Sequence, residues 1–131
     1  MGDGGRKRRV LIVEDEDNIA IALDYLMSRE GYDHARIATG KGAFERIRAD
    51  HPDLVLLDVM LPEVSGYEIC QEVRADNGLR DVKILMMTAR GSAMERRKGL
   101  ALGADGFIAK PFELKELRDE VQRLLSAGGQ G

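Results

Sequence analysis

The chain has 131 residues, of which 44% are hydrophobic and 33% are charged, and its formal net charge is −3 at pH 7. This length fits one domain with a real core, and the composition is that of an ordinary soluble globular protein. The lack of a basic surplus excludes a general nucleic-acid binder, the apolar runs are too short to span a membrane, and the single Cys70 excludes an intramolecular disulfide. We expect a cytoplasmic protein that contacts neither nucleic acid nor membrane directly.

The first strand-helix unit starts with residues 10–13, an apolar and β-branched run that stops at Glu14 and Asp15. Such a run is typical of a strand buried on both faces of a parallel sheet. Asp17 is expected to cap the following helix, which Gly31 ends. The apolar residues that repeat with helical spacing in between are Ile19, Ala20, Leu23, Leu26 and Met27.

The second and third units centre on the acid Asp58. Residues 34–38 predict a strand, and a short helix around residues 43–47 stops before Pro52. Residues 54–57 are all apolar and predict a buried strand that ends at Asp58. Pro62 and Gly66 leave a loop beside this carboxylate. A carboxylate at a rigid strand end next to a loop is a candidate nucleophile or metal ligand.

The next helix begins with a capping box, Ser65 followed three residues later by Glu68, and ends near residues 77–78. Its inner face should hold Ile69, Cys70 and Val73.

The last two units repeat this pattern. Residues 82–87 predict a strand that stops at Thr88, and Ser92 with Glu95 predicts a capped helix that ends at Gly103. Residues 107–109 form a short strand that ends at Lys110. The final helix should bury one stripe, made of Leu114, Leu117, Val121, Leu124 and Leu125, and fray over residues 128–131.

Five predicted strands alternate with five predicted helices, which suits right-handed βαβ crossovers. The sequence therefore predicts an α/β fold, a single doubly wound (βα)5 three-layer sandwich around a parallel sheet. We expect this domain to cover residues 8–126, with flexible tails at residues 1–7 and 127–131.

Polar residues with complementary chemistry follow four of the predicted strands. In parallel strands joined by helices all carboxyl ends lie along one edge of the sheet, so these residues should become neighbours. They are Glu14, Asp15, Asp58, Thr88 and Lys110. Crowded carboxylates repel one another unless a cation relieves the repulsion, and their oxygens suit Mg²⁺. A hydroxyl and an ammonium beside them could hold phosphoryl oxygens, as phosphoryl transfer requires.

At this point the sequence resembles a response-regulator receiver domain of the CheY-like kind, from about Arg8 to Ser126. The motifs that carry the resemblance are Val-Glu-Asp-Glu at 13–16, Leu-Asp-Val-Met-Leu-Pro at 57–62, Met-Thr-Ala-Arg at 87–90 and Lys-Pro-Phe at 110–112. The resemblance implies a flavodoxin-like sheet of strand order 2-1-3-4-5.

The resemblance also implies a role for each residue of the cluster. Asp58 matches the phosphoacceptor and Asp15 a direct Mg²⁺ ligand, while Glu14 matches a ligand that acts through water. Met60 matches the residue whose backbone carbonyl binds the metal.

Two further sets of residues match the family's phosphoryl-binding and switching positions. Thr88, the amide of Ala89 and Lys110 resemble the groups that contact the phosphoryl oxygens. Thr88 and Phe107 resemble the switch pair, in which Phe107 moves inward when Thr88 is drawn to the phosphate. The resemblance further implies a cis peptide before Pro111.

The implied function is that of a two-component response regulator. A histidine kinase or histidine phosphotransfer protein would phosphorylate Asp58, and the same site would later hydrolyse the acyl phosphate. Phosphorylation would repack the face made by the fourth helix, fifth strand and fifth helix, which would then bind a downstream protein.

Two alternatives from other classes compete with this interpretation. A phosphohydrolase with an aspartate nucleophile typically needs a second acid two residues further on, where this chain has Met60. A flavin-binding electron carrier needs a phosphate loop after the first strand, where this chain has four acids, residues 14–17.

Within the family, the chain could be a stand-alone regulator or a receiver excised from a longer DNA-binding regulator. Met60 and Arg90 are common in OmpR-type transcription factors, which dimerise through a ring of ion pairs. Gly106 and Glu120 depart from that group, which usually has an aspartate and an arginine there. Because a two-fold interface contains each mismatch twice, we expect a monomer, which favours the stand-alone alternative.

Overall fold

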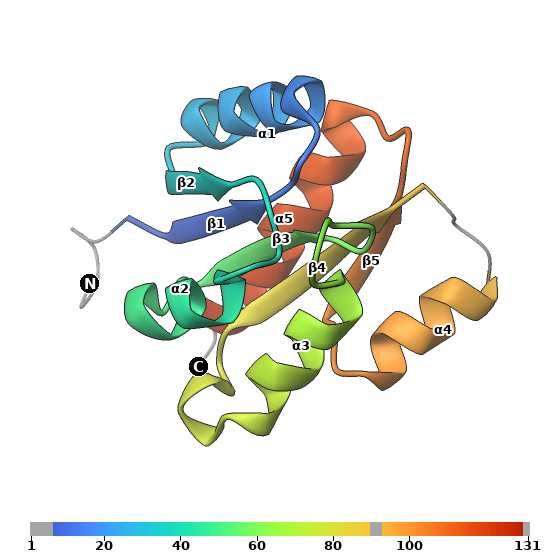
Figure 1. Ribbon diagram of the computed structural model, residues 1–131. Helices are drawn as coiled ribbons and strands as arrows, with labels where there is room; N and C mark the ends of the chain where they lie inside the picture. Colours follow the sequence, from blue (N-terminus) through green and yellow to red (C-terminus); the bar gives the residue numbers. More distant parts are fainter. Residues whose placement is uncertain (1–6, 90–92, 130–131) are drawn as a thin grey trace.

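The computed structural model of the protein describes residues 7–89 and 93–129 and contains one five-stranded parallel sheet (Figure 1). The strand order β2-β1-β3-β4-β5 confirms the predicted fold. The strands are β1 (Arg9–Val13), β2 (Asp33–Ile37), β3 (Leu54–Asp58), β4 (Lys83–Thr88) and β5 (Gly106–Ala109). The helices are α1 (Asp17–Arg29), α2 (Ala43–Asp50), α3 (Gly66–Ala75), α4 (Ala93–Ala101) and α5 (Leu114–Gly129), with a 3-10 turn at Asn77–Leu79.

Helices cover both faces of the sheet and enclose two apolar clusters (Figure 1). On one face α1 and α5 bury Leu23, Met27 and Leu117 against β1, β3 and β4. On the other face Ile47 of α2 and Ile69 of α3 pack on the same strands. The middle residues of β1, β3 and β4 are therefore apolar, because both faces of these strands are covered, and their polar residues lie at the strand ends. Among the described residues, no helix is both long enough and apolar enough to cross a membrane.

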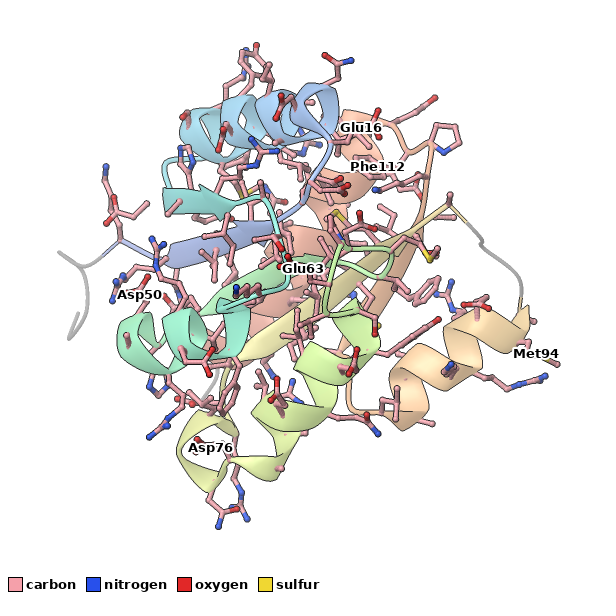
Figure 2. All side chains as sticks on the ribbon, viewed as in Figure 1. Glu16, Asp50, Glu63, Asp76, Met94 and Phe112 are labelled. Atoms are coloured by element: carbon pink, nitrogen blue, oxygen red, sulfur yellow. The ribbon has the colours of Figure 1, made fainter. Side chains whose placement is uncertain are left out.

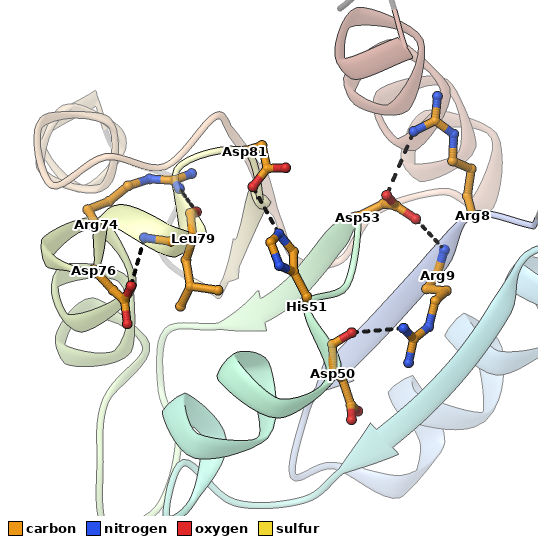
Figure 3. Close-up of polar contacts among 10 residues, drawn as sticks. Arg8, Arg9, Asp50, His51, Asp53, Arg74, Asp76, Leu79 and Asp81 are labelled. Carbon is orange, nitrogen blue, oxygen red and sulfur yellow. Dashed lines mark hydrogen bonds and ion pairs between the residues drawn. The ribbon is translucent and has the colours of Figure 1, made fainter. Parts of the chain in front are cut away.

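The amino edge of the sheet is held by pairs of polar groups (Figure 3). The Arg9 amide donates to Asp53 Oδ2 at 2.8 Å, and the Arg9 guanidinium donates to the Asp50 carbonyl at 2.8 Å. His51 Nε2 lies 2.9 Å from Asp81 Oδ1 on the loop before β4. Arg8 Nη1 also lies 3.8 Å from Asp53 Oδ1. The carboxyl edge of the sheet, in contrast, carries a cluster of acids.

Several local predictions are confirmed. Ser65 Oγ accepts a hydrogen bond from the Glu68 amide at 3.2 Å, and Glu68 Oε1 accepts one from the Ser65 amide at 3.1 Å, which is the predicted capping box. Gly31 takes a left-handed conformation, with φ +82°, directly after α1. The peptide bond between Lys110 and Pro111 is cis. The predicted capping box at Ser92 lies outside the described residues.

Two predictions for helix α1 and helix α5 are wrong. Asp17 does not cap α1, because Glu16 is the N-cap and has no side-chain cap hydrogen bond, while the Asp17 carboxylate lies 3.0 Å from Arg36 Nη2. Leu114 is predicted to belong to the buried stripe of α5 but is 38% exposed. It lies at the rim of a hollow beside α1.

Gly66 is required where α3 begins beside β3. A methyl group at this position would overlap the Asp58 carbonyl oxygen and lie 2.9 Å from Val59 Cα, and neither backbone atom can move freely. We expect Gly66→Ala to lower the free energy of unfolding by about 2 kcal/mol, a typical cost of overpacking. Urea denaturation followed by circular dichroism measures this change.

Gly78→Ala is the matched control for this substitution. Its methyl group would meet one atom within 4 Å, the Asp76 Oδ1, at 3.2 Å. We expect it to change stability by less than about 0.5 kcal/mol. If both variants lost the same free energy of unfolding, the close approach of Gly66 to β3 would not be the cause of the loss.

Candidate functional site

Three carboxylates meet at the carboxyl edge of the sheet, as the sequence predicts. Glu14 and Asp15 follow β1 and Asp58 ends β3, and these two strands are adjacent in register. The three side chains offer oxygens that all lie within 4.8 Å of one another. Glu14 is 0% exposed and Asp58 is 3% exposed, whereas Asp15 is open to solvent. Such a group of oxygens could hold a metal ion.

Lys110, directly after β5, supplies the positive charge in this cluster. Its Nζ lies 2.9 Å from Glu14 Oε1 and 3.3 Å from Asp58 Oδ2. Burial acts to lower the pKa of Lys110, but its bond to Glu14 and the charges of both acids raise it above the ordinary value. Lys110 therefore remains an ammonium group and partly neutralises the two buried acids.

The pKa of Asp58 is shifted by its surroundings in the site. Burial, assisted by repulsion from Glu14, raises the pKa of Asp58 to about 6. Lys110 and the Met60 amide, which donates to Asp58 Oδ1 at 3.2 Å, oppose this rise. The carboxylate is thus ionised at neutral pH but held at an energetic cost that a bound cation would reduce.

An open hollow of about 420 Å³ gives solvent access to these groups. It is lined by Glu14, Asp15, Glu16, Asp58, Met60, Ala89 and Lys110. Met60, one of these lining residues, is 63% exposed. The hollow brings together every predicted metal and phosphoryl residue except Thr88.

Thr88 lies next to this hollow rather than on its wall. It follows Met87, the partner of Asp58 in the sheet, and is 1% exposed. The Lys110 amide donates to the Thr88 carbonyl at 2.7 Å, which joins the ends of β4 and β5. A movement of the Thr88 backbone would therefore also shift the backbone of Lys110.

Phe107 is not part of the acid cluster. It pairs with Met86, two residues before Thr88, and is only 5% exposed. A methyl group on Gly99 of α4 would lie 3.1 Å from the Phe107 ring, so helix and ring are in close contact. The ring is already buried in this structure, against α4.

A second, more apolar hollow adjoins the first, between α1 and the loop that leads into α5. Glu16, Ile19, Ala89, Lys110 and Phe112 are among its lining residues. Figure 2 shows Glu16 and Phe112 near the starts of α1 and α5. A protein that approaches Asp58 would therefore meet an apolar surface beside it.

Sequence reasoning missed Arg36, which lies one residue before the end of β2. Its Nε donates to the Glu14 carbonyl at 2.9 Å. The Glu16 amide, also missed, donates to Glu14 Oε2 at 3.0 Å. The available signal was a basic residue near the carboxyl end of a strand, on the same sheet edge as the acids.

Comparison with known proteins agrees with this geometry. The family model described as the response regulator receiver domain matches residues 10–122. The chain is 40% identical over 117 residues to the phosphate regulon transcriptional regulatory protein PhoB of Rhizobium meliloti, covering 89% of this chain and 52% of that protein. It is 36% identical over 118 residues to the alkaline phosphatase synthesis transcriptional regulatory protein PhoP of Bacillus subtilis, covering 90% and 48%. The chain thus spans about half the length of these relatives.

Solved structures show the same fold. The chemotaxis response regulator CheY4 of Vibrio cholerae superimposes with a TM-score of 0.85 at 29% identity, covering 90% of this chain and 98% of that one. The receiver domain of the sensor histidine kinase PA1611 of Pseudomonas aeruginosa gives 0.83 at 29% identity, covering 92% and 98%, and has a magnesium ion coordinated in its active site cleft. Together with the matched domain, these findings show that the chain belongs to the family of response regulator receiver domains.

Proposed function

We propose that this receiver accepts a phosphoryl group on Asp58 and thereby switches a protein-binding surface. The observation that carries the proposal is the placement of Asp58 in an open hollow between two further acids and Lys110. A rigid strand end fixes the acceptor, and the lysine offers charge to a phosphoryl oxygen.

In the transfer step an Asp58 carboxylate oxygen forms a bond to phosphorus as the bond from phosphorus to a histidine nitrogen of the donor breaks. The imidazole leaves with the electron pair of that bond. Thr88, the Ala89 amide and Lys110 would bind the oxygens of the transferred group. Hydrolysis of the resulting acyl phosphate would return Asp58 to its carboxylate.

The same proposal assigns a Mg²⁺ site to Glu14, Asp15, Asp58 and the backbone carbonyl of Met60. The oxygen-only set of donors and the repulsion between the acids fit this cation. When bound, Mg²⁺ would offset negative charge on the carboxylates and on the phosphoryl group. The magnesium in the related PA1611 receiver supports this assignment.

Thr88 and Phe107 would connect this chemistry to the surface made by α4, β5 and α5. The Phe107 ring touches Gly99, the one buried residue that α4 contributes among its described positions. A change at Thr88 would then reach α4 through Phe107, whose ring lies next to Gly99. We propose this surface as the site where a downstream protein binds in the cytoplasm.

Two forms of the regulator are compatible with this role. The relatives PhoB and PhoP are transcriptional regulators about twice as long, which favours a receiver that controls a DNA-binding domain. Two features of the α5 surface favour a monomeric regulator instead. Glu120, which stands where dimerising OmpR-type receivers usually have an arginine, accepts a bond from Arg123 Nη2 at 2.7 Å within the chain. Gly106 stands where that group usually has an aspartate. Sedimentation of the beryllofluoride-bound protein would distinguish a dimer from the monomer that we propose.

The direct test uses the unmodified protein with Mg²⁺ and acetyl phosphate. We expect about one hydroxylamine-labile phosphate per chain, located on the peptide that contains Asp58, because one acid in the cluster ends a strand beside Lys110. Peptide mapping after labelling measures both the amount and the position. Labelling elsewhere, or none at any Mg²⁺ concentration, would refute the proposed function.

A further inference from the structure

Strand β2 holds the loop that carries two of the three acids. Arg36 pairs with Ile12 in the sheet, so its side chain starts one residue short of the carboxyl edge. Arg36 Nε donates to the Glu14 carbonyl at 2.9 Å, and the Glu14 amide donates to the Ile37 carbonyl at 3.1 Å. Both backbone polar groups of Glu14 are therefore bound by β2.

The same guanidinium also reaches the far end of this loop. Arg36 Nη2 lies 3.0 Å from Asp17 Oδ1, at the first residue of α1. The Arg36 side chain is 24% exposed, whereas that of Asp17 is 83% exposed, so the stronger constraint is the partly buried bond to the Glu14 carbonyl. Arg36 thus bridges residues 14 and 17, and Asp15 lies between the two anchored points.

We propose that Arg36 is a positioning residue that sets the orientation of the Glu14 and Asp15 carboxylates and thereby the affinity of the site for Mg²⁺. The inference rests on the proposed function, in which these acids hold the cation. Arg36 acts through the backbone of Glu14 and does not itself touch metal or phosphate. Partners of this kind commonly determine how tightly ligating side chains hold a metal.

The charge of Arg36 and its positioning role have opposite effects on cation binding. A guanidinium this close to the acids repels Mg²⁺, so removing the charge alone should strengthen binding. Removing the hydrogen bond releases the Glu14 carbonyl and loosens the loop, which should weaken binding. The sign of the change in affinity therefore separates the two effects.

Arg36→Met and Arg36→Gln form a matched pair for this test. Both remove the charge and keep the side chain up to the ε position, but the glutamine amide nitrogen occupies the place of Arg36 Nε and can still donate to the Glu14 carbonyl. Mg²⁺ titrations followed by amide NMR give the affinity of folded protein. We expect Arg36→Met to weaken binding on the order of fivefold, below the 10- to 100-fold typical of partners that touch the ligating group itself. Arg36→Gln should bind Mg²⁺ at least as tightly as the unmodified protein, because it keeps the hydrogen bond and removes the repelling charge.

Labelling by acetyl phosphate provides a second readout. For Arg36→Met the Mg²⁺ concentration at half-maximal rate should rise by the same factor, while the rate at saturating Mg²⁺ stays near that of the unmodified protein. Tighter or unchanged binding in Arg36→Met, or equal weakening in Arg36→Met and Arg36→Gln, would overturn the positioning role. If instead the unmodified protein binds no Mg²⁺, the proposed function itself fails, so the two failures are distinguishable.

Discussion

Replacing Asp58 with asparagine is expected to stabilise the protein by about 3 kcal/mol at pH 7 in the absence of Mg²⁺. In the folded chain the pKa of Asp58 is raised from 3.8 to about 6. Each pH unit of such a shift is worth about 1.4 kcal/mol, and burial of the carboxyl, which is 3% exposed, limits solvent screening. Asparagine keeps the size of the side chain and removes the charge that is costly to bury.

The sign of the pH dependence follows from proton binding. Between about pH 4 and pH 6 the folded state holds more protons at Asp58 than the unfolded state, so this carboxyl reduces stability progressively as the pH rises. The advantage of Asp58→Asn should therefore be small at pH 4, grow up to about pH 6 and remain constant above it. Urea denaturation at several pH values in EDTA measures the difference.

Mg²⁺ should reduce this advantage, because a cation bound to the acids relieves the same repulsion in the unmodified protein. The variant should also incorporate no hydroxylamine-labile phosphate. An advantage that does not change with pH would refute the electrostatic explanation, and labelling of the variant would show that another residue is the acceptor.

The sequence was sufficient to predict the sheet and most of the site because both depend on the same signal. Residues 54–57 are apolar on both faces and stop at an acid, and this pattern recurs at β1. Parallel strands place their carboxyl ends at the same edge of the sheet, independently of the conformation of the loops. The cluster of Glu14, Asp58 and Lys110 follows from topology, without knowledge of any side-chain conformation.

The contacts of Arg36 could not be predicted in this way because they depend on the register of β2. This edge strand has no fully buried residue, so hydrophobic alternation does not fix which residue lies opposite Ile12. The error at Asp17 has the same origin, since its carboxylate lies beside Arg36 instead of capping α1. Polar partners across a sheet edge leave little trace in sequence periodicity.

Helix α4 shows a second limit of sequence reasoning. Only Gly99 is buried among its described residues, so it has no apolar stripe to dock it. Tyr67 of α3 instead donates a hydrogen bond to Glu95, and Lys98 Nζ lies 4.3 Å from the centre of the Tyr67 ring. Burial and the bond to Glu95 raise the pKa of Tyr67 to about 12, which keeps the hydroxyl a donor. This polar attachment suits the movement of α4 that we propose for the switch.

Replacing Lys110 with methionine is expected to destabilise the protein by about 3 kcal/mol at pH 8 without Mg²⁺. The ammonium lies 2.9 Å from a Glu14 oxygen and 3.3 Å from an Asp58 oxygen, and both acids are buried. Removing one partner of a buried ion pair leaves charge without compensation and typically costs about 3–5 kcal/mol. The Glu16 amide still donates to Glu14 Oε2, which places the expected loss at the lower end of that range. Urea denaturation again gives the difference.

Lys115→Met serves as the control, because Lys115 also lies 2.9 Å from a carboxylate but is 72% exposed. Ion pairs in solvent contribute little, so its loss should be below about 0.5 kcal/mol. The loss in Lys110→Met should shrink at pH 5, where protonation removes one of the two buried charges, and shrink again when Mg²⁺ replaces the ammonium as the compensating cation. If the loss is the same at pH 5 and pH 8 and does not respond to Mg²⁺, Lys110 contributes by packing its aliphatic chain rather than by its charge, and its proposed contact with the phosphoryl group would lose its electrostatic basis.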